Sequence, residues 1–140
     1  MATFTKYQDT VQQFWTAIHN LVASGHVVKA AIHTDAPVVA SDDELADLTQ
    51  VVATGYTAGG EDIQNDMTET GGVATMTGVD VVWTAGAGGW GATVARYVSI
   101  YNDTSTGDKL IGSWDYGANF SLAATETFTL DFGASVATLT

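Results

Sequence analysis

The sequence contains no cysteine, only one proline and only four basic residues. Without cysteine, the chain has no disulfide bond, no thiolate nucleophile and no cysteine ligand for zinc. The four bases face sixteen acidic residues, which leaves a net charge of −12. Because a charge of this sign repels the phosphates of nucleic acids, we expect no nucleic-acid partner.

Long apolar stretches are missing as well. No part of the sequence approaches the roughly 18 apolar residues of a membrane-spanning helix. The N-terminus also lacks the basic region and apolar run of a secretory signal peptide. We therefore expect no membrane partner, and synthesis in a cytoplasm.

The high content of hydrophobic residues predicts one folded domain. Hydrophobic residues make up 46% of the 140 residues, which is enough for a buried core. With no internal repeat and no linker, residues 1–140 are expected to form a single domain. Short alternating segments between turn residues predict a mainly β (α+β) fold. We expect an antiparallel β-sandwich or partial barrel with one N-terminal amphipathic helix packed on it.

The only strong helical periodicity lies near the N-terminus. Apolar residues recur there at spacings of three and four, and two neighbours widen the stripe: Tyr7, Val11, Phe14, Ile18 and Leu21, with Trp15 and Val22. Thr5 suits an N-cap, and Gly25 suits a helix end. We expect an arm over residues 1–5, a helix over residues 6–23 and mostly β structure over residues 26–140.

The clearest β signal is the stretch 93–117. Two alternating segments flank a cluster of turn formers at 102–108, which predicts a hairpin. Further strands are expected over 26–33, 51–53, 73–84, 120–122, 126–132 and 136–139. Ser41 and Glu44 have the spacing of a capping box before a helical turn, and 55–72 is typical of a long surface loop.

Two groups of residues resemble cofactor or metal sites. Gly86, Gly88 and Gly91 match GxGxxG, but a dinucleotide site needs a helix after the glycines, and the residues that follow favour a strand. His19, His26 and His33 are spaced seven apart but fall on different expected elements, and a structural zinc site wants four ligands. Surface or half-buried histidines are the expectation, and we expect no cofactor.

Acidic residues form two groups that could hold a hard cation such as calcium: Asp42, Asp43, Glu44 and Asp47 in one, and Glu61, Asp62 and Asp66 in the other. Neither matches the calcium-loop motif. The first group also suits the start of a helix. We expect both to be solvated acidic surface and not metal sites.

Recognisable catalytic signatures are missing from the sequence. Asp80, Asp115 and Glu126 lie near Trp83 and Trp114 in the sequence, and a pair of such carboxylates is what glycoside hydrolysis requires. Large aromatic residues at strand positions usually pack in the core, however. Ser113 lacks the GxSxG context of a nucleophile. We expect no enzymatic activity.

Several segments share the pattern of a known family: 1–9, 19–21, 34–37, 55–60, 101–104, 110–112, 114–117 and 126–132. On these segments the chain resembles small virion structural proteins of tailed bacteriophages, over almost its whole length. The acidic segment 41–44 and the glycine-rich segment 86–91 depart from that pattern.

The resemblance implies a capsid decoration, or cement, protein that binds the outside of the capsid and bridges neighbouring subunits. The implied partner is the major capsid protein, with the chain present on the capsid as a dimer or trimer and made in the cytoplasm of the bacterial host. No catalytic residue is carried over. Two alternatives are a tail-associated structural protein and a carbohydrate-binding module on the particle surface that uses Trp90 and neighbouring acids.

Candidate partner contacts come from the expected arm and loop, because mobile segments can order on binding. Trp90 joins them because it stands among glycines, where we expect it to be exposed. The full set is Met1, Ala2, Thr3, Phe4, Tyr56, Ile63, Met67 and Trp90. Edge strands of the hairpin could also pair with a second copy.

Overall fold

Antiparallel strands dominate the computed structural model, which describes residues 3–140. The largest sheet has five strands in the order β1-β8-β7-β2-β3. Their bounds are β1 Phe4–Lys6, β8 Lys109–Phe120, β7 Ala95–Asn102, β2 Val28–His33 and β3 Glu61–Asp62. The predicted hairpin is confirmed as β7 and β8, joined by a turn at 103–108, and it lies at the centre of this sheet.

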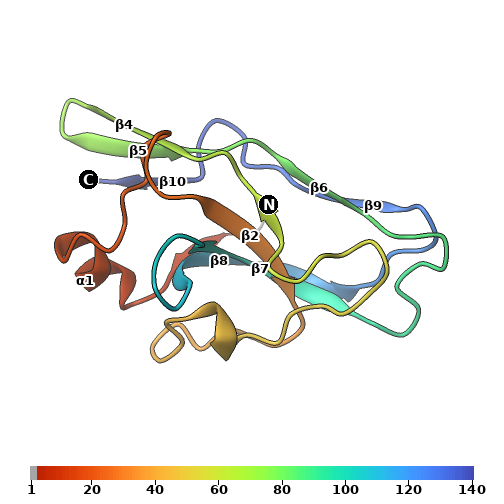
Figure 1. Cartoon of the computed structure of the whole chain (residues 1–140). Coiled ribbons are helices and arrows are strands. Elements are labelled where there is room, and N and C mark those ends of the chain that lie inside the picture. Colours follow the sequence, from red (N-terminus) through yellow and green to blue (C-terminus); the bar gives the residue numbers. More distant parts are fainter. Residues whose placement is uncertain (1–2) are drawn as a thin grey trace.

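Two smaller sheets form a second layer on one side of the large sheet (Figure 1). One contains β10 (Ala137–Leu139), β5 (Val73–Thr77) and β4 (Asp66–Thr70), in that order. The other pairs β6 (Val81–Thr84) with β9 (Thr127–Leu130). Side chains of both layers form the main core, among them Ile32, Ile100, Met76 and Trp83. The mainly β, antiparallel fold is thereby confirmed.

The opposite face of the large sheet is covered by the segment after β2. This segment contains the short 3₁₀ helix η1 (Leu45–Asp47), and a second apolar cluster joins Leu45 and Leu48 to Tyr7, Tyr101 and Leu110. The centre of the sheet is therefore buried on both faces. This explains why five of the six residues of β2 are buried instead of alternating with exposed ones.

The predicted helix over residues 6–23 is wrong in extent. Helix α1 spans only Thr10–Trp15, and Phe4–Lys6 forms β1 instead of a free arm, with Phe4 opposite Trp114 in β8. Buried Tyr7 follows β1, and its hydroxyl is hydrogen-bonded to Ser99 Oγ at 2.8 Å. Ala17 then takes a positive φ of 59°, which ends the helical region. Long-range pairing has overridden the local helical pattern.

Smaller differences concern five other segments. The expected strand over 120–122 does not form as a separate strand, because Phe120 ends β8 and the residues after it are irregular. The expected strand over 73–84 is two strands, β5 and β6, and the expected loop 55–72 contains β3 and β4. The capping box lies at Glu44 and Asp47, three residues later than predicted. At 51–53 no strand forms; Gln50 makes an isolated bridge with His33.

Candidate functional site

A cleft of about 350 Å³ opens where the edge of the large sheet meets β9. Two groups of aromatic rings contribute to its walls. In the first, the Trp114 ring lies 5.0 Å from Phe4 and 5.7 Å from Phe132. In the second, Tyr116 and Phe128 lie 5.8 Å apart. We call this site the aromatic cleft.

An irregularity in the hairpin positions Tyr116 at this cleft. The register pairs Ala95 with Phe120 but Tyr97 with Asp115, so only Arg96 faces the four residues 116–119. Such a bulge bends the strand and re-aims its side chains. Gly117 takes a φ of 91° in the bulge, and Tyr116 remains 58% exposed.

An ion pair fixes the base of this bulge. Arg96 donates to both carboxylate oxygens of Asp115, through Nε at 2.7 Å and through Nη2 at 2.9 Å. The Gly117 amide donates to Asp115 Oδ1 at 2.7 Å. The hydrogen bonds from Arg96, and to a smaller extent the one from Gly117, lower the pKa of Asp115 to about 2. The Arg96 charge is thereby neutralised at the cleft.

A second exposed feature is the outer face of α1. Trp15 is 89% exposed, and Val11, one turn earlier, is 47% exposed. The sequence placed both on the buried stripe, whereas the helix instead buries Thr10 and Gln13. Thr10 Oγ1 donates to the carbonyls of Leu110 and Ile111, both at 3.1 Å, which fixes the helix with Trp15 facing outward.

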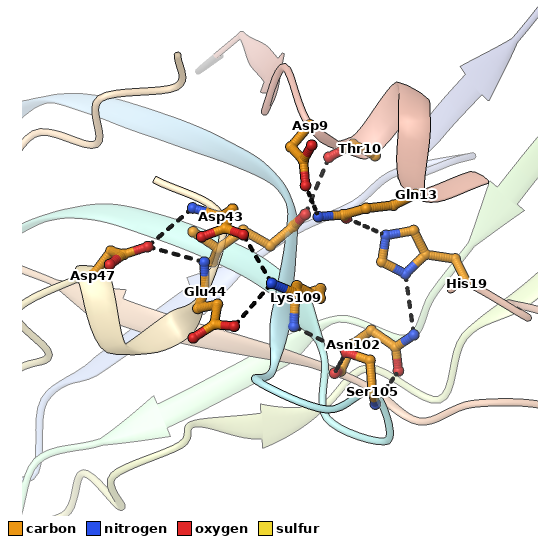
Figure 2. Close-up of polar contacts among 11 residues, drawn as sticks. Asp9, Thr10, Gln13, His19, Asp43, Glu44, Asp47, Asn102, Ser105 and Lys109 are labelled. Carbon is orange, nitrogen blue, oxygen red and sulfur yellow. Dashed lines mark hydrogen bonds and ion pairs between the residues drawn. The ribbon is translucent and has the colours of Figure 1, made fainter. Parts of the chain in front are cut away.

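In the acidic group Asp42, Asp43, Glu44 and Asp47, a lysine side chain pairs with two of the carboxylates (Figure 2). Lys109 Nζ lies 2.8 Å from both Asp43 Oδ2 and Glu44 Oε1, and these bonds raise the pKa of Lys109. Asp47 Oδ2 accepts the amides of Asp43 and Glu44, which lowers the pKa of Asp47. Across residues 3–140, no set of three or more metal-binding side chains is placed to hold an ion.

Two of the three histidines meet around Asn102. Its Nδ2 lies 3.1 Å from His19 Nδ1 and 2.9 Å from His26 Nδ1. His19 Nε2 also contacts Gln13 Oε1 at 2.7 Å (Figure 2). His19 is buried, unlike the surface or half-buried histidine expected, and burial lowers its pKa to about 4. The neutral ring therefore carries its proton on Nε2 and accepts at Nδ1.

The third histidine lies in a separate buried network. His33 Nε2 is 2.9 Å from Ser99 Oγ, and His33 Nδ1 is 2.9 Å from the Asp35 carbonyl oxygen. The residue types are those of a serine hydrolase triad. However, Ser99 and His33 are fully buried, and the serine hydroxyl is also bonded to Tyr7. This arrangement links Tyr7, just after β1, to β2 and β7, and it offers a substrate no access to the hydroxyl.

The predicted partner-contact residues differ in their exposure to solvent. Ile63 is 0% and Trp90 is 4% exposed, so neither can touch a partner of the folded chain, and the expected exposure of Trp90 is wrong. Tyr56 and Met67 are half-buried, and the Tyr56 hydroxyl accepts the Ile32 amide at 3.0 Å. Thr3 is exposed and Phe4 half-buried, while Met1 and Ala2 lie outside the described residues.

Other candidates from the sequence have structural roles. Gly86, Gly88 and Gly91 lie in the connection from β6 to β7, and the strand predicted after them is confirmed as β7. Asp80 Oδ1 accepts the Phe132 amide, and Glu126 Oε2 accepts the Ala123 amide. In the second acidic group, Asp66 Oδ1 accepts the amides of Ala23 and Met67.

Sequence reasoning missed Tyr116 and Arg96 as site residues. It also missed the exposure of Trp15. A glycine inside an otherwise regular strand often marks a bulge, so Gly117 was the available signal for the first two. No such signal marks Trp15, because its exposure depends on where the helix ends and on which face packs.

Comparisons of the chain with protein-family models, with curated proteins and with solved structures found no match. In the part of the chain that the structure describes, none of the helices has the length and apolar character needed to cross a bilayer. The site geometry and the resemblance noted above are therefore the basis for a functional proposal.

Proposed function

We propose that this chain is a structural virion protein that binds the outside of a tailed-phage capsid and bridges neighbouring capsid subunits. The single observation that carries the proposal is the 89% exposure of Trp15 on α1. Tryptophan is among the residues that most often dominate the binding energy of protein interfaces. Val11 adds exposed apolar surface beside it.

Bridging requires a second contact away from α1. Val52 is 87% and Val94 is 43% exposed, and Thr93 Oγ1 donates to the Val52 carbonyl at 3.3 Å, which brings their two segments together. These segments lie toward the end of the molecule opposite α1 (Figure 1). A body with an apolar contact at each end can join two capsid subunits.

The rest of the folded chain would act as a rigid spacer between these two contacts. Its core is continuous across the two layers, and the surface carries most of the net charge of −12, which disfavours self-association in solution. Many copies that bind only the assembled shell would stabilise it by mass action. Dimers or trimers on the capsid would increase this effect by avidity.

The test uses heads of the phage that encodes the chain, prepared from a mutant that lacks it. Purified protein should co-sediment with these heads and saturate at a fixed ratio to the major capsid protein. It should also raise the temperature at which the shells melt. Recovery in purified tails alone would instead support the tail-associated alternative, and binding to neither particle would overturn the proposal.

A further inference from the structure

The aromatic cleft has the features of a small-molecule site. Its volume of about 350 Å³ lies within the range of known ligand pockets, which are mostly apolar with a few placed polar groups. The two ring groups supply the apolar walls. Trp114 and Tyr116 both line the cleft; Tyr116 is largely exposed and Trp114 is half-buried, so both rings can contact a ligand.

Polar groups with both donor and acceptor capacity line the same cleft. Arg96 offers guanidinium donors, Asp131 offers carboxylate oxygens, and Thr129 and Ser135 carry hydroxyls that can act as either. Asp131 is exposed, and one of its oxygens accepts only the Gly133 amide, at 2.8 Å. A ligand rich in hydroxyl groups could satisfy donors and acceptors of this kind together.

The charges in the cleft disfavour an anionic ligand, and the hydroxyl groups that line it disfavour a quaternary ammonium. Arg96 is neutralised by its bidentate pair with Asp115, and the chain as a whole carries −12, so an anionic ligand gains no attraction. A quaternary ammonium would suit aromatic walls. A quaternary ammonium has no hydrogen-bond donor or acceptor, however, and would leave the hydroxyls of Thr129 and Ser135 without a partner in the ligand.

We propose that the aromatic cleft binds a short neutral saccharide. The C–H groups on the faces of its sugar rings would contact Trp114 and Tyr116, because these groups are attracted to the negative face of an aromatic ring. Its hydroxyls would bond to Arg96 and Asp131. This site differs from the carbohydrate site expected from the sequence, since Trp90 is buried. It also lies apart from the α1 contact proposed for the capsid.

The experiment titrates the isolated protein with a panel of neutral trisaccharides: maltotriose, cellotriose and N,N′,N″-triacetylchitotriose. Sialyllactose and choline are the anionic and cationic comparisons. Binding is followed by tryptophan fluorescence in a Trp15→Phe background, which removes the most exposed indole and leaves Trp114 as the reporter at the cleft. Calorimetry of the unmodified protein provides the independent readout. At least one neutral trisaccharide should bind saturably.

Two variants localise the binding. Tyr116→Ala should weaken the saccharide affinity at least tenfold, and Asp131→Asn should weaken it severalfold while keeping the oxygen that accepts the Gly133 amide. Val82→Ala, on the outward face of β6, is the matched control and should bind as the parent does. If Tyr116→Ala does not fold, the saccharide affinity of Asp131→Asn still tests whether the ligand binds in the aromatic cleft.

The proposal is overturned if no neutral trisaccharide binds, if sialyllactose or choline binds in their place, or if both cleft variants bind like the Val82→Ala control. Because this assay contains no heads, the absence of saccharide binding would not contradict the capsid proposal. The absence of head binding would likewise not contradict the saccharide site.

Discussion

The side-chain amide of Asn102 donates to Nδ1 of His19 at 3.1 Å across 83 residues of sequence. This bond ties the irregular segment after α1 to the end of β7. Burial lowers the pKa of this imidazole, and the bond fits the neutral ring, because a proton on Nδ1 would face the amide hydrogens of Asn102.

Stability should therefore fall when the solution is acidified. The folded-state pKa of His19 is about 4, below its ordinary value of 6.5, so the unfolded chain takes up the proton first as pH decreases. The His19 contribution is fully present above pH 6.5 and is lost progressively toward pH 4. Its full loss corresponds to roughly 3 kcal/mol. Urea unfolding between pH 7 and pH 4 at constant ionic strength measures it.

The His19→Gln variant separates this effect from the titration of carboxylates. Glutamine does not titrate and can still accept from Asn102. The difference in unfolding free energy between the parent and this variant should change between pH 6.5 and pH 4. A constant difference over that range would show that His19 does not control the pH dependence. Burial also lowers the pKa of His33, so a residual slope of the same sign is expected in the variant.

The Trp15→Ala variant should lose head binding without losing stability. Truncation of a central interface tryptophan typically costs about 2 kcal/mol or more, which is a loss of roughly 30-fold in affinity. The unfolding free energy of the isolated protein should change by no more than about 0.5 kcal/mol, since Trp15 is exposed. Quantitative co-sedimentation and urea unfolding give the two values.

Gln12→Ala is the control for this variant, because Gln12 is exposed on the same short helix. It should bind heads as the parent does. Equal losses for both variants would indicate a general effect on α1, and unchanged binding by Trp15→Ala would place the capsid contact elsewhere.

Gly60→Ala should strongly destabilise the fold. Gly60 has a φ of +67°, and a Cβ there would collide with the backbone carbonyl of Ala30 in β2. The expected loss is about 3 kcal/mol or more. Gly71→Ala has a similar φ of +62° but open space around it, so it should cost only about 1 kcal/mol. Chemical denaturation of both variants tests the difference, and similar losses would contradict the close approach of Gly60 to β2.

Lys109→Met should destabilise the protein more than Lys29→Met. Lys109 bridges Asp43 and Glu44, whereas the Lys29 ammonium lies 3.0 Å from Asp103 alone. Because the carboxylates of Asp43 and Glu44 are partly exposed, the Lys109 loss should be only about 1 kcal/mol and should shrink at high salt. Thermal melts at low and high ionic strength provide the comparison. A larger effect of Lys29→Met would be the contrary result.

The sequence alone predicted features that depend on neighbouring residues. The absence of cysteine excluded disulfide and thiolate chemistry, and alternation with turn formers predicted the β7–β8 hairpin and the mainly β fold. Strands β2, β9 and β10 also lie within predicted segments. These predictions held because side-chain alternation and turn conformation are local properties of the chain.

Only the tertiary structure decided the ends of the helix and the residues of the candidate sites. Phe4–Lys6 pairs with β8, more than a hundred residues away, and this pairing makes a strand of the end of the expected arm and the first residue of the expected helix. The same folding leaves Trp15 in solvent, buries Trp90, and brings Asp43 and Glu44 to Lys109. Such outcomes depend on which distant segments bury one another, and the energy of that burial outweighs the local preferences that a sequence pattern records.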